Sequence, residues 1–391
     1  MRAMLTSVGL AGHVFPVLAL ARQLRARGHE VLVETSERWR DTVEGMEMRF
    51  APAHGIPRRA GNGAGAAPTL AHAARSLLPT LREFRPDVIV SDLFTLAPAL
   101  AAEAAGVPRA SLIHHPYPVS EPTRPSFPLG FLPPRQPLAA GAWRAVRPLL
   151  DLRLRRGRRE LNEARAALGL PGARRFYGSI SEGLALVATF PQLEYPRRWP
   201  AHVHVTGPMI FELPHPEIEL LEGAEPLVVV AASSAQDPEL TLVRIALEAL
   251  QDEPVRVVAT TSGTGAAREE RAPDNAMVLD WVSYAQVMPR ASLVVCSGGH
   301  GTVARALADG VPLLVSPAGA DQPENGARVT WAGAGLMLPG RLLGPRPLRW
   351  AVRRLLADRR FTDRAAQIAA WSRRNDGTAR GAELVERLAS R

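Results

Sequence analysis

Lysine is absent from this sequence, because all 47 basic residues are arginine. A genome-wide coding bias towards arginine is the simplest cause. The absence excludes mechanisms that need a lysine amine, such as a P-loop phosphate lysine, a kinase ATP lysine or a pyridoxal Schiff base. Cysteine occurs once, as Cys296, which excludes an internal disulfide, a four-cysteine zinc site and an iron–sulfur cluster. One cysteine also suits a reducing compartment.

Long apolar runs are missing as well, since no 18 consecutive residues are apolar. The nearest candidate, Ser7–Ala21, resembles a short secretory signal segment. Two glycines, a histidine and a proline interrupt it, however, and charged residues follow at once. We therefore predict a soluble, cytoplasmic protein with no membrane span.

Positive charge is in excess, with a formal net charge of +9. The densest basic run lies between Arg153 and Arg159, where two glutamates follow it and no aromatic residue interrupts it. Nucleic-acid surfaces usually interleave aromatic side chains for base stacking. A solvated helix face is the favoured interpretation, and no nucleic-acid partner is expected. The excess also suits a small anionic substrate.

With 391 residues, 46% of them hydrophobic, the chain is long enough for two globular domains. Strand-like runs alternate with helical stretches in both halves, which predicts an α/β protein with two doubly wound parallel sheets. A polar, proline-rich segment, 208–226, separates the halves. The expected strands are Met1–Val8, Glu30–Thr35, Asp87–Val90 and Arg109–Ile113, then Leu227–Ala232, Val255–Thr260, Ala276–Asp280, Leu293–Cys296 and Pro312–Ser316, with helices at Pro238–Leu250 and Thr302–Ala308.

Two irregular stretches interrupt the first half. Ala51–Thr69 is rich in glycine, alanine and proline, and His115–Pro137 is rich in proline. Long irregular insertions in α/β domains are usually disordered or functional. We favour a functional role, because both stretches would leave the sheet at the same end as the turn at Gly12.

The strongest chemical signal is the run Cys296-Ser297-Gly298-Gly299-His300-Gly301-Thr302, between an apparent strand and a helix. Glycines let a ligand approach the backbone closely, and a helix start offers unpaired N–H donors with a partial positive charge. Together they predict an anion site of diphosphate size that needs no metal. A tight structural turn is the alternative, but it would need fewer glycines.

Two weaker polar pairs follow other strands of the second half. The hydroxyls of Ser233 and Ser234 would bind phosphate or cap the helix expected at Pro238. Asp321 and Gln322 would bind vicinal sugar hydroxyls or cap a helix. Sequence alone leaves both choices open.

In the first half, Gly12-His13 marks the junction between the first strand and its helix, and Asp92 ends a later strand. A neutral imidazole at His13 could accept a hydroxyl proton, and Asp92 could orient the ring. The pairs His114-His115 and His202/His204 lack a cysteine or carboxylate at ligand spacing, so no metal site is predicted. The first turn is also not a G-x-G-x-x-G dinucleotide motif.

Taken together, these segments resemble the GT-B glycosyltransferases, in particular the nucleotide-sugar-dependent family (family 1 type) of plant, antibiotic-tailoring and glucuronosyl transferases. The resemblance covers nearly the whole chain. It rests on Gly12-His13-Val14, on Arg27-Gly28-His29, and on the block from Asp280-Trp281 to Asp321-Gln322. The actinobacterial natural-product subgroup is the most similar.

The resemblance implies two Rossmann-like domains that face each other across a cleft. Residues 1–207 would bind the acceptor, 208–226 would link the domains, 227–365 would bind the donor, and a final helix in 366–391, around Trp371, would cross back. Transfer would invert the anomeric carbon, with His13 as base and Asp92 as its partner. The donor would contact Gly12, Ser233, Ser234, Trp281, Val282, Ser297, Gly298, Gly299, His300, Gly301, Thr302, Asp321 and Gln322.

Three positions depart from the family pattern. Ser297 stands where a histidine usually contacts the diphosphate, so one charge-assisted contact worth about 1.5–3 kcal/mol is lost. His300 is the candidate to compensate. Arg305 stands where plant enzymes have a ribose-binding glutamate, which favours a deoxyribose donor such as a TDP-sugar, and Ser283-Tyr284 replace Pro-Gln.

We therefore expect a metal-independent inverting glycosyltransferase without a cofactor, which transfers sugar from a UDP- or TDP-sugar to a hydroxyl of a hydrophobic natural product. The irregular stretches would wall the acceptor pocket, and a homodimer is a possible assembly. One alternative is a non-catalytic auxiliary protein for a partner transferase, which the loss of histidine at Ser297 would suit. The other is a nucleotide-sugar epimerase on the same architecture.

Overall fold

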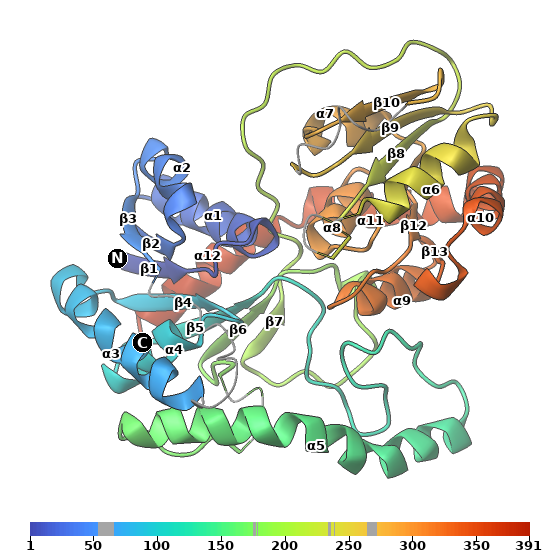
Figure 1. Ribbon diagram of the computed structural model, residues 1–391. Coiled ribbons are helices and arrows are strands. Elements are labelled where there is room, and N and C mark those ends of the chain that lie inside the picture. The colour runs from blue at the N-terminus through green and yellow to red at the C-terminus, as the bar shows by residue number, and fades with distance from the viewer. Residues whose placement is uncertain (54–65, 175–176, 178, 234–235, 238, 264–271) are drawn as a thin grey trace.

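The computed structural model describes residues 1–391 except 54–65, 175–176, 178, 234–235, 238 and 264–271. It comprises two α/β domains, one built from the first half of the chain and one from the second (Figure 1). The expected fold class, two doubly wound parallel-sheet domains, is thus confirmed.

The N-terminal domain contains a seven-stranded sheet in the order β3-β2-β1-β4-β5-β6-β7, and every pair is parallel. The chain adds strands on one side of β1 as far as β3 and then on the other side from β4 onward, which creates a topological switch point at the carboxyl ends of β1 and β4. The strands are β1 (Arg2–Thr6), β2 (Glu30–Thr35), β3 (Arg49–Pro52), β4 (Val88–Asp92), β5 (Arg109–Ile113), β6 (Leu184–Val187) and β7 (Val203–Val205).

Helices cover both faces of this sheet because its central strands are apolar on both sides. One face packs against α1 (Ala11–Ala26), α2 (Arg40–Gly45) and the last helix of the chain, and the other against α3 (Ala66–Phe84), α4 (Leu96–Ala104) and α5 (Pro137–Ala167). Of α5, only the second half enters the core, through Leu161 and Ala164.

The C-terminal domain repeats this plan with a six-stranded parallel sheet in the order β10-β9-β8-β11-β12-β13. Its switch point lies between β8 and β11. The strands are β8 (Leu227–Ala231), β9 (Arg256–Thr260), β10 (Ala276–Leu279), β11 (Leu293–Cys296), β12 (Leu313–Val315) and β13 (Gly335–Met337). The helices are α6 (Thr241–Leu250), α7 (Tyr284–Val287), α8 (His300–Ala308), α9 (Gln322–Ala332), α10 (Pro345–Ala357) and α11 (Arg359–Arg374).

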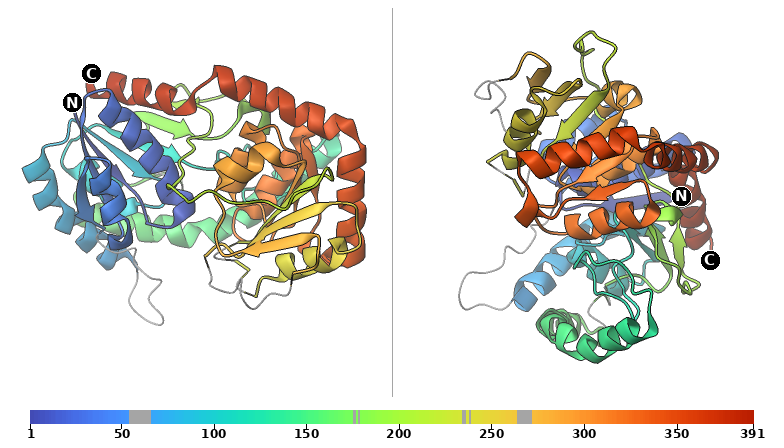
Figure 2. Two further views of the ribbon diagram at one scale, coloured as in Figure 1. Left: turned by 90° about the horizontal axis from the view of Figure 1, so that it is seen from above. Right: turned by 90° about the vertical axis from the view of Figure 1, so that its right-hand side faces the viewer.

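The chain passes between the domains twice. Residues 206–226 form no helix or strand and lead from β7 to β8. The return is made by α12 (Gly377–Ala389), which lies beside α1 and buries Ala382 and Val385 in the N-terminal core (Figure 2).

The final segment differs from the single crossing helix expected around Trp371. Trp371 belongs to α11, which packs on α8 of the C-terminal domain, and its ring contacts Phe190 edge-on. A new helix begins after Asp376, whose carboxylate accepts two backbone N–H groups at the start of α12. The cap at Asp376 explains why the structure has two helices, α11 and α12, where the sequence predicted one.

The stretch His115–Pro137 lacks regular structure as far as residue 136 and reaches across to the other domain. The Gly130 amide donates to Glu324 Oε2 at 3.3 Å, and a Cβ on Gly130 would lie 2.6 Å from Pro323. This loop therefore packs against the start of α9. Most of the other irregular stretch, Ala51–Thr69, lies outside the described residues.

Within the part of the chain that the structure describes, no helix has the length and apolarity needed to cross a bilayer.

Candidate active site

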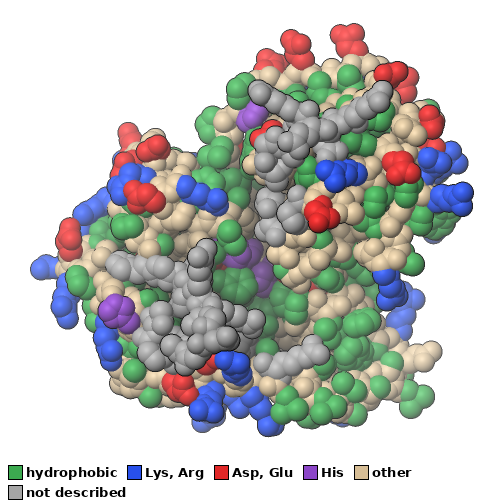
Figure 3. All heavy atoms as spheres, in the orientation of Figure 1, with side chains coloured by type: hydrophobic (Ala, Val, Ile, Leu, Met, Phe, Trp, Pro, Cys, Tyr) green, Lys and Arg blue, Asp and Glu red, His purple; other side chains and the backbone are tan. Residues whose placement is uncertain are grey.

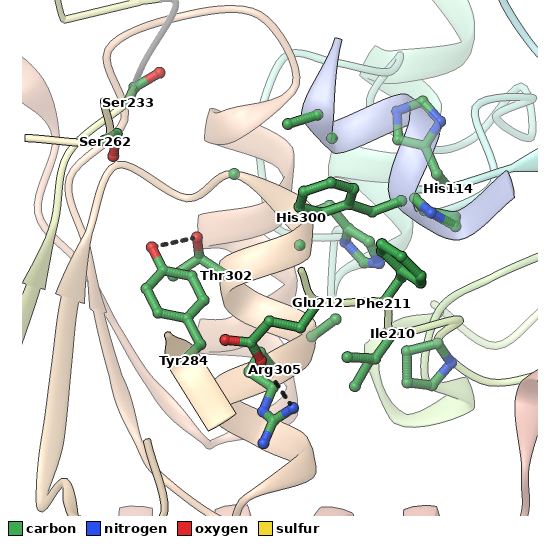
Figure 4. Close-up of a pocket in the computed structure, with 18 of the residues that line it drawn as sticks. His114, Ile210, Phe211, Glu212, Ser233, Ser262, Tyr284, His300, Thr302 and Arg305 are labelled. Atoms are coloured by element: carbon green, nitrogen blue, oxygen red, sulfur yellow. Dashed lines mark hydrogen bonds and ion pairs between the residues drawn. The ribbon is translucent and has the colours of Figure 1, made fainter. Parts of the chain in front are cut away.

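The switch points of the two sheets face each other across a cavity of about 260 Å³. Parallel α/β sheets bind ligands in such crevices, because the connections after the two strands at the switch point run to opposite faces of the sheet. Figure 3 shows the hollow between the domains, and Figure 4 shows the lining side chains. The lining comes from α1, from residues 208–212 of the connecting segment, and from the carboxyl end of the C-terminal sheet.

The glycine-rich turn after β11 is shaped by backbone requirements. Gly298 has a φ of +92°, and a Cβ there would lie 2.6 Å from Val315 Cγ1. Gly299 and Gly301, by contrast, have open space where a Cβ would be, and both line the cavity with Ser297 and Thr302. The amides at the start of α8 therefore border an open space of the kind that a small anion needs.

His300 follows these glycines but turns towards the N-terminal domain. Its Nε2 lies 3.3 Å from the Ala188 carbonyl oxygen. Burial, together with the charge of His115, lowers the pKa of His300 to about 4. The imidazole is therefore neutral near pH 7, and it does not supply the positive charge that Ser297 lacks. The prediction that His300 replaces the charge of the histidine missing at Ser297 is therefore wrong.

Ser233 lines the cavity, whereas Ser234 lies outside the described residues. The Ser233 hydroxyl accepts hydrogen bonds from the Gln236 amide and from Gln322 Nε2, both at 3.1 Å. The capping alternative for Ser233 does not hold, because the carboxylate of Asp237 accepts the two amide N–H groups at the start of α6. That helix begins at residue 241, after Leu240 and later than expected.

Asp321 and Gln322 lie beside the cavity and are not among its lining residues. Gln322 Oε1 accepts from the amides of Ala318 (2.8 Å) and Gly319 (3.2 Å), so this side chain fixes the turn before α9. Asp321 Oδ2 accepts from Asn325 Nδ2 at 2.8 Å. Burial lowers the pKa of His115, and the negative charge of Asp321 partly offsets this shift. The carboxylate of Asp321 is therefore near enough to act on a histidine of the N-terminal domain.

Trp281 and Val282 also line the cavity, and Trp281 is 40% exposed. A flat, partly exposed indole can stack on a nucleobase, as the family resemblance implies. Thr302 Oγ1 donates to the Tyr284 hydroxyl at 3.4 Å in the same region. Burial raises the pKa of Tyr284 to about 12, so this phenol stays protonated.

Glu212, which sequence reasoning did not single out, comes from the connecting segment and lines the same region. Its carboxylate accepts from Ser283 Oγ at 2.7 Å and from the Ala285 amide at 2.9 Å. Arg305 Nη1 lies 3.5 Å from Glu212 Oε2, and Arg305 Nε donates to Asp309 at 2.7 Å. The two carboxylates thus hold the guanidinium that replaces the plant-type glutamate (Figure 4).

Across the cleft, His13 and Asp92 lie at the N-terminal switch point. The short turn after β1 places His13 in the first turn of α1, and Asp92 is the last residue of β4. His13 Nδ1 lies 2.9 Å from Asp92 Oδ2. Hydrogen bonds from His114 and His13 hold the pKa of Asp92 well below its usual range although burial opposes this shift.

An ionised Asp92 can only accept hydrogen bonds, so His13 donates to it through Nδ1–H, which leaves Nε2 as the nitrogen that can accept a proton. His13 does not itself line the cavity, but its neighbour Gly12 and its stacking partner His114 do. The imidazole has the tautomer that a general base needs.

His114 is a third member of this group. Its Nδ1 lies 3.4 Å from Asp92 Oδ1, and its ring centroid lies 3.9 Å from that of His13. Burial and the neighbouring charge of His13 lower the pKa of His114 to about 3, so it is neutral at working pH. No sequence signal paired His114 with Asp92, because their proximity depends on the pairing of β4 with β5, which residue spacing does not record.

The ligand-capable atoms of His13, Asp92 and His114 lie within 4.8 Å of one another, close enough to hold a metal ion. The sequence argument against a metal at His114 assumed that no carboxylate lies nearby, and that assumption is wrong. His13 Nδ1 is hydrogen-bonded to the carboxylate and His114 Nδ1 lies 3.4 Å from its other oxygen, so contacts among the three side chains account for the cluster. Metal independence remains a prediction.

Comparison with known proteins places this geometry in a family. Residues 3–114 match the glycosyltransferase family 28 N-terminal domain, and residues 244–389 match the erythromycin biosynthesis protein CIII-like C-terminal domain. The chain is 32% identical to 4'-demethylrebeccamycin synthase of Lentzea aerocolonigenes, across 96% of this chain and 97% of that protein. The chain belongs to the natural-product glycosyltransferases of GT-B fold.

Other members of the family align over nearly their full length. The O-mycaminosyltylonolide 6-deoxyallosyltransferase of Streptomyces fradiae is 29% identical, across 100% of this chain and 98% of that protein. Among solved structures, the glycosyltransferase of kitacinnamycin has a TM-score of 0.76 at 22% identity, covering 99% of this chain and 98% of that one. The glycosyltransferase VinC, in complex with dTDP, has a TM-score of 0.70 at 21% identity and covers both chains fully.

The family resemblance and the GT-B fold expected from the sequence are thus confirmed. The structure of this glycosyltransferase adds His114, Glu212 and the segment 208–212 to the candidate site. Segment 208–212 looked like a plain linker, and only its apolar residues Met209, Ile210 and Phe211 hinted at a buried role.

Proposed function

We propose that this glycosyltransferase moves a sugar from a UDP- or TDP-sugar to a hydroxyl of a hydrophobic small molecule, with inversion at the anomeric carbon. The observation that carries the proposal is the 2.9 Å hydrogen bond between His13 Nδ1 and Asp92 Oδ2, opposite an open glycine-rich turn. A base and an anion site that face each other across one cavity fit a reaction that removes a proton and releases a diphosphate.

In the proposed reaction, His13 Nε2 accepts the proton of the acceptor hydroxyl while its oxygen attacks the anomeric carbon. The bond from that carbon to the diphosphate oxygen breaks as the new bond forms on the opposite face. Asp92 stabilises the imidazolium that results. His114 holds the second oxygen of Asp92, so the carboxylate is fixed from both sides.

On the donor side, negative charge grows on the departing diphosphate. The amides at Gly299 and Gly301 and the hydroxyls of Ser297 and Thr302 border the space that the diphosphate would occupy. Donors that are already in position stabilise developing charge without a reorganisation cost. A metal would then not be required to neutralise the leaving group.

A nucleoside diphosphate also fits the cavity chemically, because both Trp281 and the glycine-rich turn line it. The dTDP complex of VinC supports this class of ligand, and the 6-deoxyallosyl transferase supports a deoxysugar. The exposed Phe94, whose ring lies 5.1 Å from that of His13, suits an apolar acceptor.

The experiment is a donor and acceptor panel with purified protein, read by mass spectrometry. We expect a glycosylated product with one or more UDP- or TDP-hexoses, and chromatography should show a β-linkage from an α-linked donor. Donor binding with no turnover on any acceptor would favour the auxiliary protein, and a donor that isomerises without acceptor would favour the epimerase.

A further inference from the structure

The first half of α5 carries an apolar surface that the other described residues leave uncovered. Leu138 is 86% exposed and Leu149 is 65% exposed, although both belong to a regular helix. Six of the twelve exposed large hydrophobic side chains in the described residues lie between 131 and 152, namely Phe131, Leu132, Leu138, Val146, Leu149 and Leu152. Such concentration indicates an interaction surface.

Helical geometry places the apolar residues of α5 on one side. At 100° per residue, Leu138, Gly141, Ala142, Ala145, Leu149 and Leu152 fall within an arc of about 100°, hereafter the apolar strip. No charged residue interrupts the strip, and its length along the helix is roughly 20 Å. The second half of α5 behaves differently, since it buries its inner face through Leu161 and Ala164.

Arginines border the strip and continue beyond it. Residues 135–163 contain eight arginines against three acidic residues, a net charge of +5 within the +9 of the whole chain. Two of these arginines, Arg156 and Arg159, form i,i+4 pairs with Glu160 and Glu163 and still keep most of their side-chain surface in water. The surface is therefore apolar at one end and strongly basic at the other.

A second copy of this chain fits such a surface poorly. A two-fold pairing of α5 along the strip would bring two segments of net charge +5 together, which is unfavourable in a partly desolvated interface. The favoured occupant instead has an apolar interior and negative charge at its surface. A bilayer that contains anionic lipid has both properties.

We propose that the apolar strip and the arginines beside it dock this glycosyltransferase on an anionic membrane surface. Helices that lie in the plane of a membrane share these features: one apolar face, abundant arginine or lysine, and no segment that spans the bilayer. The leucines would enter the region between headgroups and acyl chains. The arginines would contact lipid phosphates.

The position of α5 allows this contact. The helix is the outermost element along one edge of the molecule, with no other element outside it (Figures 1 and 2). In Figure 3 hydrophobic side chains gather at this edge, below the hollow between the domains. The described surface here is one long helix, with Pro148 inside it, and not a groove, so a lipid surface matches it without the shape complementarity that a protein partner needs.

The test is co-sedimentation of the full-length protein with vesicles of phosphatidylcholine alone or with about 30 mol% phosphatidylglycerol. We expect binding to the anionic vesicles only, and release at about 0.5 M salt. The double substitution L138E/L149E should lower the bound fraction roughly ten-fold or more. Both side chains are exposed, so the fold should be retained, which an unchanged melting temperature would verify.

Leu342→Glu is the matched control, because Leu342 is 53% exposed on the C-terminal domain, far from α5 in sequence. It should leave vesicle binding unchanged. Wild-type protein that stays in the supernatant with both vesicles overturns the proposal and leaves a protein partner as the occupant. A dimer that L138E/L149E converts to a monomer, measured by light scattering, overturns it in favour of self-association. Neither outcome touches sugar transfer, which is assayed separately.

Discussion

The two switch points of this glycosyltransferase have the same topology but opposite chemistry. At the N-terminal one, between β1 and β4, the buried Asp92 is hydrogen-bonded to His13 at 2.9 Å, and His114 Nδ1 lies 3.4 Å from its other oxygen. At the C-terminal one, between β8 and β11, the cavity is bordered by glycine amides and serine hydroxyls, and the nearby His300 is neutral. One crevice suits proton transfer, and the other suits the binding of an anion.

The comparison teaches that the doubly wound sheet supplies a place and the residues after its strands supply the chemistry. A side chain at the end of a strand can be titrated and can move a proton. A backbone amide carries a fixed partial charge, so it binds a diphosphate equally well at any working pH. If this division is right, substitutions at the N-terminal switch point should lower turnover, and substitutions at the C-terminal one should lower nucleotide affinity.

The largest effect is expected for His13→Ala, which removes the proposed base. The turnover number should fall roughly 10²–10⁴-fold, the usual contribution of general base catalysis, while affinity for the nucleotide stays unchanged. Turnover measured by mass spectrometry and nucleotide binding by calorimetry would check both. His72→Ala, an exposed histidine on α3, is the control. Near-normal turnover of His13→Ala would remove the base assignment.

At the C-terminal switch point, Gly298→Ala should lower the stability of the folded protein. An alanine at this position must adopt a backbone conformation with positive φ, and its Cβ would lie 2.6 Å from Val315 Cγ1. Together these two effects should lower the free energy of unfolding by about 2–4 kcal/mol. Gly299→Ala meets no protein atom within 4 Å, so it should keep stability and weaken nucleotide binding instead. Denaturant unfolding and calorimetry separate the two. Equal loss of stability in both variants would contradict this account of the turn.

Asp92→Asn tests the support of the base. An amide retains the shape but cannot stabilise an imidazolium, so turnover should fall by about 1.5–3 kcal/mol, roughly ten- to hundred-fold. Nucleotide affinity should again be unchanged. The neutral side chain can also flip its amide and reverse the tautomer of His13, which would appear as an altered pH profile of turnover. Wild-type turnover with a wild-type profile would leave Asp92 without a role.

Acid stability sharpens the comparison, because each side holds a buried neutral histidine. Burial lowers the pKa to about 3 for His114 and to about 4 for His300. Between pH 6.5 and pH 4 the unfolded chain therefore binds more protons than the folded one, and stability falls as the pH falls. Asp92 adds to the decline mainly below about pH 5, where the unfolded carboxyl, with a pKa of 3.8, takes up a proton that the folded one does not.

The substitutions His114→Asn and His300→Asn should each flatten this decline by up to about 1.4 kcal/mol per pH unit. The free energy of unfolding from denaturant titrations at several pH values gives the slope, independently of any constant loss that the substitution itself causes. Slopes parallel to the wild type would mean that these histidines are not buried in the neutral form.

The smallest effect is expected for Ser297→Ala. A neutral hydroxyl donor to the diphosphate is worth about 1 kcal/mol, so nucleotide affinity should fall roughly five-fold with little change in turnover. Ser297→His would restore the residue usual in the family, and we expect it to bind more tightly if the imidazole is protonated. Unchanged affinity in both variants would place the diphosphate elsewhere along the turn.

The sequence predicted the fold because its signals are local. Apolar runs such as Leu227–Ala232 and Leu293–Cys296 have strand length and are bounded by glycine, proline or polar residues, so β8 and β11 fall within a residue of their expected ends. Each element is then placed by the right-handed crossover rule, which leaves few arrangements for alternating strands and helices. The glycine-rich turn was recognisable for the same local reason.

Contacts between distant segments were not accessible in this way. His114 meets Asp92 because β4 and β5 pair side by side, and no spacing in the sequence records that register. Glu212 reaches the cavity only because residues 206–226 fold back along the C-terminal domain. His300 was misjudged for a related reason, since its neutrality depends on burial against Ala188 from the other domain.

Gly207 and Gly377 show how the two passages of the chain between the domains are related. A Cβ on Gly377 would lie 2.5 Å from the Gly207 carbonyl oxygen, so the outgoing and returning segments pack against each other near these two glycines. Any relative motion of the domains must preserve both covalent connections. A rotation about an axis through this contact lengthens neither of them, whereas sliding one domain along the other would strain both. The crossing therefore limits the ways in which the donor and acceptor halves can approach each other.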